Sequence, residues 1–446
     1  MKHIFLKKKI LAVTIVLLAV IGFTSYPLAG SVKNPRTNET FATIQAAIND
    51  TDTLDGDLLE VGTGTYYENV NVNKAFLTII KEDNADPIVD GNGTGHTFTL
   101  TSYGITIENL TIKNSGNYYG VKIDGGYNTI LENNIQDCYR GVNVNSSQNT
   151  VKENNFQDCN RGVMVNSSYN IIKENDFQGC MWSAQVNSNH NIIYKNTFSD
   201  CDRGVYLYGY QAVNNVVCDN IISGFGTGGI YLAFCSENWI YRNDITGSGN
   251  PQYGDAGINM AAASSNFIYA NDIQDCHDGL YMEYSDVNKI HHNNFIDNNP
   301  YHANIYECSG NTWDTGGTTG GNYWSGVSCT DADSDLICDS AYSIPGGDGD
   351  QDGYPLVGYW SPICGNVNGD PRGDITLGDI TSLVAYLVVT PGTPEPVPPC
   401  AGDVNGDGEV TESDTQYLVN YLFLDGPPPV GDCCEQLVLP WLFLNE

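Results

Sequence analysis

Two acidic loops near the C-terminal end of the chain have the side chains and the spacing of calcium ligands. In the segment DVNGDGEVTESD, oxygen-bearing residues occupy positions 1, 3, 5, 7, 9 and 12: Asp403, Asn405, Asp407, Glu409, Thr411 and Asp414. Carboxylate, amide and carbonyl oxygens at this spacing surround Ca²⁺ in twelve-residue loops, and a glycine at position 6 makes the sharp turn. The segment therefore predicts a calcium site, to which Glu409 contributes its backbone carbonyl.

An earlier copy of this loop is two residues longer, through Pro371 and Arg372. Its corresponding residues are Asn366, Asn368, Asp370, Asp374, Thr376 and Asp379. Apolar residues at helical spacing follow each loop, with Leu383 and Leu387 after the first and Leu418 and Leu422 after the second. A chance Asp/Gly-rich turn would not recur with its own helix, so residues 362–430 are predicted to form a small calcium-binding domain.

A third group of acids lies between Cys329 and Cys338, two cysteines that are candidates for a disulfide. The acids are Asp331, Asp333, Asp335 and Asp339. Alternating carboxylates can hold calcium, but this segment lacks the glycine and the closing acid of the standard loop. Calcium binding at these four residues and simple exposure to water are both left open.

Six residues are candidates for sugar chemistry, because glycosidases use paired acids and lyases use a base with arginine or calcium. They are His277, Asp278, Glu283, Arg140, Arg161 and Arg203. An aspartate in a turn more often caps backbone N–H groups than catalyses. Acids that converge with an arginine in an aromatic-lined groove would indicate an enzyme, whereas acids scattered over separate repeats would indicate binding.

Other side chains could have either a structural role or a chemical one. Cys138, Cys159, Cys180 and Cys201 recur every 21 residues and are expected to be buried thiols, since no close-spaced cysteine pair or nearby histidine completes a metal site. His291 and His292 are expected to face solvent. Six aromatic residues either stack on sugar rings or are simply outward strand residues: Trp182, Tyr206, Tyr208, Tyr231, Tyr281 and Tyr284.

An internal repeat supplies the elements that must position these residues. One asparagine column is Asn128, Asn149, Asn170, Asn191, Asn214, Asn238, Asn266 and Asn288, and a second begins five residues later at Asn133, Asn154, Asn175, Asn196, Asp219, Asn243, Asn271 and Asn293. Between the columns stands an aliphatic residue, such as Ile130 or Val216, and Ile or Phe follows, as at Ile221. Such short alternating segments predict strands, and a period near 22 predicts coils that stack on themselves.

Stacking would place equivalent residues about 4.8 Å apart and turn the asparagine columns into amide ladders. Residues 56–310 are therefore predicted to form the coils of an all-β solenoid. A short helix within Phe41–Asp50, in residues 31–55, would cover the exposed end of the first coil. Residues 311–361, which contain the third group of acids, would close the other end.

The N-terminal residues 1–30 have the order of a secretory signal peptide, with four lysines before an apolar run. A membrane anchor is the alternative, but the run is short for a bilayer, and no later segment is long enough to span one. Removing the four lysines changes the formal charge from −34 to −38, which argues against nucleic acid as a partner. We expect a secreted, extracellular or cell-surface protein with disulfides, ending in a packed tail over residues 431–446.

These patterns resemble known families. Residues 40–360, including Gly62, Thr65, Tyr66 and Glu68, resemble pectin-lyase-like proteins, and the repeats resemble the NosD family and related carbohydrate-binding and sugar-hydrolase β-helices. Residues 364–426 resemble a type I dockerin. The resemblance implies a right-handed, single-stranded parallel β-helix with a small α-helical dockerin that binds Ca²⁺ and docks to a cohesin.

Three functions follow from the resemblance and the candidate residues. The first is polysaccharide binding by a surface or complex-associated protein that its dockerin attaches to a cohesin. The second is a polysaccharide lyase or glycoside hydrolase acting on acidic polysaccharide. The third is copper maturation of the NosD kind, which the dockerin and the scarcity of His and Met ligands argue against.

Overall fold

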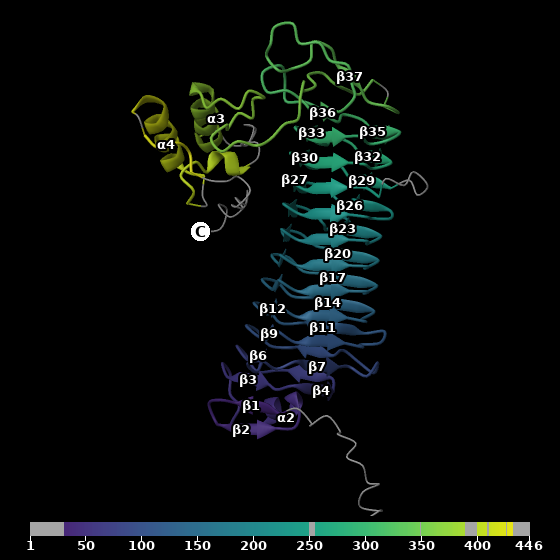
Figure 1. Cartoon of the computed structure of the whole chain (residues 1–446), viewed down its shortest axis with the longest axis vertical. Coiled ribbons are helices and arrows are strands. Elements are labelled where there is room, and N and C mark those ends of the chain that lie inside the picture. Colours follow the sequence, from purple (N-terminus) through teal and green to yellow (C-terminus); the bar gives the residue numbers. More distant parts are fainter. Residues whose placement is uncertain are drawn as a thin grey trace, which may run out of the picture.

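The computed structural model describes residues 31–248, 255–347, 349–388, 399–407, 410–424 and 426–430. The predicted signal peptide, the predicted tail at 431–446 and Glu409 lie outside these residues. The described strands from β1 to β36 wind into a rod of stacked coils, and two helices of the C-terminal domain lie beside one end of it (Figure 1). None of the described helices combines the length and the apolar character that crossing a membrane requires.

Each coil contributes one strand to each of three sheets, which we call sheets A, B and C. Sheet A runs in the order β2 (Glu39–Phe41), β1 (Val32–Asn34), β3 (Leu58–Val61), β6 (Thr78–Lys81), β9 (Thr106–Glu108), β12 (Thr129–Leu131), β15 (Thr150–Lys152), β18 (Ile171–Lys173), β21 (Ile192–Tyr194), β24 (Val216–Cys218), β27 (Trp239–Tyr241), β30 (Phe267–Tyr269) and β33 (Lys289–His291). Sheet B comprises β4 (Gly64–Tyr67), β7 (Pro87–Asp90), β10 (Thr111–Lys113), β13 (Asn134–Gln136), β16 (Asn155–Gln157), β19 (Asp176–Gln178), β22 (Thr197–Ser199), β25 (Ile221–Ser223), β28 (Asp244–Thr246), β31 (Asp272–Gln274), β34 (Asn294–Ile296) and β36 (Tyr323–Trp324). Sheet C comprises β5 (Val70–Val72), β8 (Phe98–Leu100), β11 (Tyr119–Ile123), β14 (Arg140–Val144), β17 (Arg161–Val165), β20 (Trp182–Val186), β23 (Arg203–Tyr208), β26 (Gly228–Ala233), β29 (Ala256–Ala261), β32 (Asp278–Glu283) and β35 (Tyr301–Tyr306). Neighbouring coils pair in parallel, which confirms the predicted all-β solenoid.

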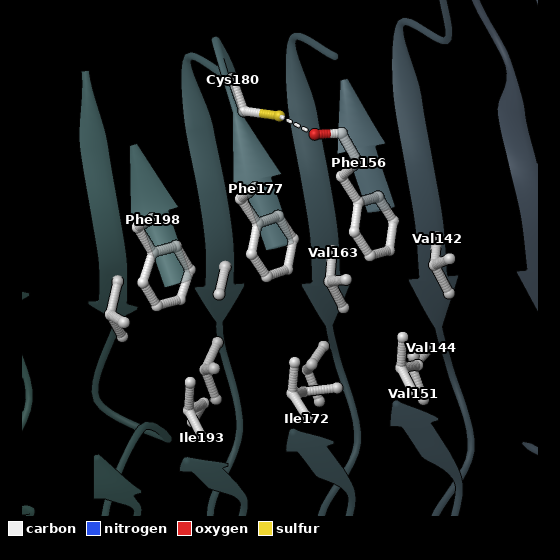
Figure 2. Packing of buried hydrophobic residues seen from close by; sticks show 14 of the residues in the cluster. Val142, Val144, Val151, Phe156, Val163, Ile172, Phe177, Cys180, Ile193 and Phe198 are labelled. Atoms are coloured by element: carbon white, nitrogen blue, oxygen red, sulfur yellow. Dashed lines mark hydrogen bonds between the residues drawn. The ribbon is translucent and has the colours of Figure 1, made fainter. Parts of the chain in front are cut away.

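The interior of the rod is filled by columns of identical or similar apolar side chains. Phe156, Phe177 and Phe198 stack with ring centroids 4.6 and 4.9 Å apart, beside aliphatic columns from sheets A and C (Figure 2). The cysteine column lies in this interior with 1–3% of each residue exposed, and Cys180 Sγ points at the Phe156 carbonyl. The expected buried thiols are thus confirmed, and they pack as small apolar groups.

Both asparagine columns form the predicted ladders. The backbone N–H of each asparagine donates to the side-chain carbonyl of the equivalent residue in the next coil, as from Asn149 to Asn170 at 2.8 Å and from Asn154 to Asn175 at 3.0 Å. The side-chain amide donates to nearby carbonyls, so these residues are almost fully buried yet hydrogen-bonded. Such a ladder satisfies buried polar groups at every coil without any charge.

One coil of the predicted alignment was wrong by a single residue. The ladders run through Asn215 and Asn220, not Asn214 and Asp219. Asp219 instead has φ 54°, the left-handed turn conformation that precedes a ladder asparagine in the other coils. In the segment NNVVCDNII, Asn, Val and Ile each occur as an adjacent pair, so two alignments that differ by one residue both fit most of the repeat pattern. In the structure, Val217 and Ile222 occupy the core positions that the sequence alignment assigned to Val216 and Ile221.

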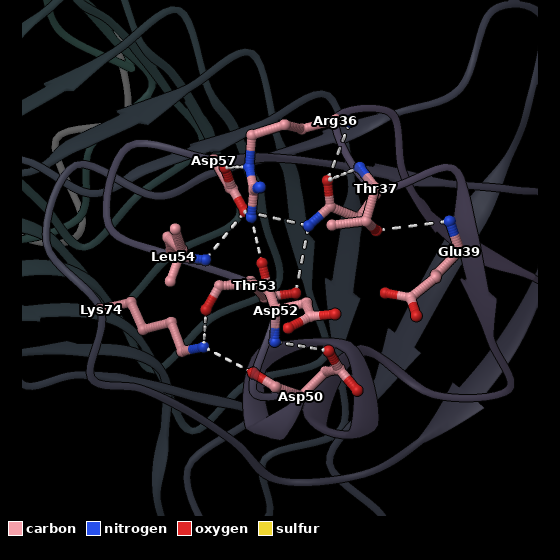
Figure 3. A network of polar contacts seen from close by, with 10 residues as sticks. Arg36, Thr37, Glu39, Asp50, Asp52, Thr53, Leu54, Asp57 and Lys74 are labelled. Atoms are coloured by element: carbon pink, nitrogen blue, oxygen red, sulfur yellow. Dashed lines mark hydrogen bonds and ion pairs between the residues drawn. The ribbon is translucent and has the colours of Figure 1, made fainter.

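A helix lies against the first coil, and it is shorter than the segment proposed from the sequence. Helix α2 (Ile44–Asn49) buries Ile44, Ala47 and Ile48 against the interior, and the Glu68 carboxylate accepts hydrogen bonds from two backbone N–H groups at its start. The antiparallel strand β1 covers the edge of β3, and Arg36 forms an ion pair with Asp57 that lowers the pKa of this carboxyl (Figure 3). These contacts prevent the first coil from offering free strand edges.

The other end of the rod is closed by a segment with two short strands of its own, β37 (Tyr342–Ser343) and β38 (Gln351–Asp352). The fully buried carboxylate of Asp352 accepts hydrogen bonds from Asn322 N at 2.7 Å and from Trp324 Nε1 at 2.9 Å. Asn322 is the last asparagine of the second ladder, so Asp352 terminates that ladder. A disulfide joins Cys329 and Cys338 in the same segment.

The C-terminal domain contains α3 (Leu377–Val388), a short 3₁₀ helix (Pro399–Gly402) and α4 (Glu412–Phe423). The two helices pack through the predicted apolar residues, and Leu383 and Leu418 are fully buried between them. Val367 and Val404, each the second residue of an acidic loop, join the same cluster. The packing therefore orients both loops from one small core.

Candidate functional site

The second acidic loop folds around the carboxylate of Asp414, the residue at position 12. Asp414 Oδ1 accepts from Val404 N at 2.9 Å and Asn405 N at 3.2 Å, and Oδ2 accepts from Thr411 N at 2.8 Å. Ligand oxygens of Asp403, Asp407 and Asp414 lie within 4.8 Å of one another. Three carboxylates this close repel one another unless a cation lies among them.

The first loop repeats this arrangement around Asp379. Asp379 Oδ1 accepts from Asn368 N at 3.1 Å, and Oδ2 accepts from Thr376 N at 2.7 Å. Helix α3 begins at position 10 of its loop, as α4 does, once Pro371 and Arg372 are treated as an insertion. The two loops are therefore structurally equivalent, and the insertion does not disturb the closing acid.

The residues present fit calcium. Asn366, at position 1 of the first loop, is 2% exposed, and its Oδ1 has no hydrogen-bond donor among the described residues. A buried carbonyl oxygen without a donor is costly unless a cation or water contacts it. Burial raises the pKa of Asp379 and of Asp414 despite their backbone hydrogen bonds, so both carboxylates lie where a bound cation would relieve a desolvation cost.

The first loop also contacts the closed end of the rod. His292 Nε2 lies 2.9 Å from the Thr319 carbonyl and 3.1 Å from the Gly369 carbonyl of the loop. Arg372, in the insertion, donates to the Ser334 carbonyl at 2.8 Å. A cleft of about 390 Å³ separates the loop from Asp335 and its neighbours. The insertion therefore joins the C-terminal domain to the closing segment.

The expectation that His291 and His292 face solvent was wrong. His291 is 8% exposed and His292 is fully buried, and their Nδ1 atoms lie 2.9 Å apart. Burial lowers the pKa of His292 to about 4, so the ring is neutral at physiological pH. The closing segment and the first loop contact the His292 ring through Thr319, Trp360 and Gly369, which lie far along the chain and outside the repeat.

Three of the four acids in the third group come together. Ligand oxygens of Asp331, Asp333 and Asp335 lie within 4.8 Å of one another, whereas Asp339 Oδ2 accepts from Ala332 N. Repulsion by Asp335 and Asp331 raises the pKa of the exposed Asp333. Calcium binding here stays a prediction, because nothing in this segment besides the acids points to an ion.

The six candidates for sugar chemistry all lie on or beside sheet C. Arg140, Arg161 and Arg203 occupy one register position, which Trp182 fills in the strand between Arg161 and Arg203. Asp278 takes the same position three strands further on, in β32. Three strand spacings amount to about 14 Å. The arginines and the acids therefore lie on the same face of sheet C, but they are too far apart to form a single site.

The acidic end of sheet C contains Asp255, which was not among the candidate residues identified from the sequence. Asp255 is 1% exposed and accepts from His277 N at 3.3 Å, and its charge contributes to the raised pKa of Asp278, of which burial is the main cause. His277 Nδ1 lies 3.4 Å from Asp278 Oδ1. Glu283 stands at the far end of β32, where Tyr281 donates to it. Asp255 lies outside any repeated motif, so the sequence offered no signal for it.

Aromatic side chains concentrate on the same face. Tyr206 and Tyr231 are paired across β23 and β26, and Tyr281 continues their register position in β32. Ring centroids of Tyr206 and Tyr231 lie 5.2 Å apart, and Trp182 lies 5.7 Å from Tyr206. Tyr208 and Tyr284 are the more exposed members of the set, at 43% and 52%.

Comparison with known families agrees with this architecture. Residues 96–233 match the family described as right handed beta helix region, residues 183–329 match periplasmic copper-binding protein (NosD), and residues 365–423 match the dockerin type I domain. A relative described as a cell surface glycoprotein of Methanothermus fervidus is 36% identical over 123 residues. These residues are 27% of this chain and 18% of the length of that relative.

Similar solved structures include a mannuronic acid specific polysaccharide family 6 lyase from human gut microbiota, with a TM-score of 0.47 and 13% identity over 63% of this chain and 76% of that chain. A periplasmic alginate epimerase has a TM-score of 0.34 at 14% identity, covering 57% and 84%. An alginate lyase from Paenibacillus sp. has a TM-score of 0.33 at 13% identity, covering 59% and 94%. The stacked coils and the family matches together define the architecture. The chain is a right-handed parallel β-helix protein that carries a type I dockerin domain over residues 365–423.

Proposed function

We propose that this protein is an extracellular or cell-surface polysaccharide-binding protein, which its calcium-loaded dockerin attaches to a cohesin. The main support for calcium-dependent attachment is the pair of equivalent loops around Asp379 and Asp414. In the first of these loops the buried Asn366 Oδ1 has no hydrogen-bond donor among the described residues. Type I dockerins bind calcium and dock to cohesins as a family. The match to a cell surface glycoprotein and the export signal expected in residues 1–30 support the location.

Calcium would be held by the oxygens at positions 1, 3, 5, 7, 9 and 12 of each loop. In the second loop these are Asp403, Asn405, Asp407, the Glu409 carbonyl, Thr411 and Asp414, and in the first loop Asn366, Asn368, Asp370, Asp374, Thr376 and Asp379. The ion would neutralise the clustered carboxylates and fix the start of each helix. Since α3 and α4 share one core, both loops contribute to a single docking domain.

The polysaccharide function rests on the outer face of sheet C, where aromatic rings and arginines gather on consecutive strands. Aromatic faces stack on the apolar faces of sugar rings, and arginine forks donate to sugar oxygens. We favour binding over catalysis, because Asp278 lies about three strand spacings from Arg203, and Asp255, next to Ala256 of β29, about two. We do not propose copper delivery, since each metal-competent cluster in the described part of the chain consists of carboxylates.

Attachment is tested by capture of the full chain on immobilised type I cohesin domains, with and without a calcium chelator. We expect calcium-dependent capture and binding of two calcium ions per chain by calorimetry. Asp414→Ala should abolish one calcium site, and Asp379→Ala the other. Arg203→Ala, on the distant sheet C, is the control and should leave capture unchanged. Capture by none of a panel of type I cohesins, or capture that persists without calcium, would overturn this part of the proposal.

A further inference from the structure

Planar cationic and aromatic groups form a stack along one edge of sheet C. His96 stacks on Tyr119 with centroids 5.0 Å apart, and the Arg140 guanidinium lies 5.2 Å from the Tyr119 ring centroid in the next coil. Arg161 lies 4.5 Å from the centroid of Trp182, which Arg203 approaches from the other side at 5.4 Å. The stack therefore runs along the rod from β8 to β23 and holds three cations.

These cations have few partners of their own. Among the described residues, no carboxylate forms an ion pair with Arg140 or Arg161. Arg203 has one long ion pair, in which its Nε lies 3.9 Å from Oδ2 of the partly exposed Asp202. The Nε–H groups of all three arginines are buried and find no hydrogen-bond acceptor in the part of the chain that the structure describes. Burial and the adjacent Arg140 lower the pKa of Arg161, so like charges are held side by side. An anion between them would relieve this repulsion.

The stack is an exception on this molecule. The chain has 19 Lys and Arg against 53 Asp and Glu, yet three of its arginines gather in one register column, and among the described residues only Asp202 places a carboxylate within 4 Å of any of them. Tyr206 and Tyr231 flank the column, and the Arg203 guanidinium contacts both rings, at 4.7 and 4.5 Å from the centroids.

We propose that the outer face of sheet C from β8 to β26 binds a linear anionic polysaccharide, whose acidic groups contact Arg140, Arg161 and Arg203. The inference rests on the polysaccharide binding proposed above and names its ligand class and its contact surface. The chain of sugars runs across the coils, along the rod. Arg140 and Arg161 are about 5 Å apart by strand spacing, and Arg203 lies about 10 Å further, so the site spans several sugars.

The same face gives this site a defined end. Gly228 and Ala256 follow Arg203 in the column, and Asp278 comes next, with Glu283 at the other end of its strand. Carboxylates at β32 repel an anionic polymer, so the bound chain ends before them. Carboxylate and sulfate groups share the chemistry that a guanidinium fork recognises. The test therefore includes both kinds of polymer.

The experiment measures binding of the full chain, at fixed calcium and ionic strength, to polygalacturonate, its fully methyl-esterified form, a sulfated dextran and unmodified dextran. We expect polygalacturonate or the sulfated polymer to bind at least about tenfold more tightly than its neutral counterpart, because hydrogen bonds to charged groups are stronger. Affinity should fall as salt is added. The better of the two anionic polymers identifies the acidic group.

Variants locate the site. The double variant Arg140→Gln/Arg161→Gln should weaken binding of the anionic polymer at least about tenfold, and Trp182→Ala should weaken it less. Lys152→Gln/Lys173→Gln is the matched control, since it removes two cations from sheet A, where each pairs with a neighbouring glutamate. Arg140→Lys/Arg161→Lys keeps the charge but loses the planar fork, so it should bind with intermediate affinity. Unchanged thermal unfolding would show that each variant remains folded.

The outcomes separate the two proposals. If neither anionic polymer bound more tightly than its neutral counterpart, or if the sheet A control lost as much affinity as the arginine variant, the anionic site would be overturned while polysaccharide binding remained. Absence of binding to every polymer tested would refute polysaccharide binding itself, and with it this inference.

Discussion

The β-helix and the dockerin solve the same problem, the burial of polar groups, by opposite means. In the β-helix, Asn149, Asn170 and their equivalents pass hydrogen bonds from coil to coil, so each neutral amide is satisfied by an identical neighbour. In the dockerin, Asp403, Asp407 and Asp414 bring carboxylates together, and such a cluster needs a cation. A ladder of amides is complete without any ligand, whereas the acidic loops would be completed by the proposed calcium ion.

Removal of calcium should give the largest effect and should act on the dockerin alone. A chelator leaves clustered carboxylates that repel, so α3 and α4 lose the loops that orient them, while the amide ladders keep the coils intact. Asp403→Ala should reproduce much of this loss. Calorimetry with and without chelator is the measurement. A single transition that shifts as one unit would contradict the existence of an independent calcium module.

Breaking one rung of a ladder should cost the β-helix about 2–3 kcal/mol in the free energy of unfolding. Asn170→Ala removes the acceptor for Asn149 N and leaves that group buried without a partner. Asn166→Ala, on the exposed side of the same coil, is the control and should change stability by about 0.5 kcal/mol or less. Denaturant unfolding measures both. An equal loss in the free energy of unfolding for the two variants would mean that the ladder hydrogen bonds contribute no more to stability than the exposed ones.

The end of the second ladder should respond to pH through Asp352. Burial raises the pKa of this carboxyl to about 6, above its ordinary value of 3.8. Between these values the folded chain binds a proton that the unfolded chain has lost, so the contribution favours folding at low pH and is lost as pH rises through about 6. Asp352→Asn adds another amide to the ladder and removes the titrating group. We therefore expect its stability relative to wild type to rise by about 2 kcal/mol between pH 4.5 and pH 7.5.

A pH-independent difference between Asp352→Asn and wild type would contradict this assignment. Thermal unfolding at matched ionic strength measures it, and Asp350→Asn, which changes a less buried acid of the same segment, provides the comparison.

The contact between the two regions should give the smallest effect. Arg372→Ala removes the hydrogen bond to the Ser334 carbonyl, an exposed interaction worth about 1 kcal/mol or less. We expect faster amide hydrogen exchange in residues 366–376 with little change in unfolding temperature. Calcium affinity of the second loop should stay the same, which distinguishes loss of this contact from damage to the domain. Unchanged exchange in the first loop would show that Arg372 does not hold it.

The coils could be predicted from the sequence because each coil repeats the same order of buried aliphatic residues and ladder asparagines. Ile130, Asn133 and Ile135 recur with their neighbours at one period, and only stacked strands use such a period. The prediction failed where residues were doubled, as at Asn214 and Asn215, because either frame assigned an aliphatic residue to each core position. The turn conformation of Asp219 decided the frame, and a left-handed φ is a property of the folded backbone.

The sequence by itself determined the solenoid, its cysteine and asparagine columns, and the order of oxygen ligands in both acidic loops, since all of these depend on spacing within tens of residues. Only the tertiary structure decided the stack of Arg140, Arg161 and Trp182 with its rings, the burial of His292 and the place of Asp255 beside Asp278. Arg140 and Trp182 are 42 positions apart in the sequence but two strands apart in sheet C. His292 is buried by residues up to 77 positions away, and such contacts form only when the closing segment and the dockerin fold back onto the last coil.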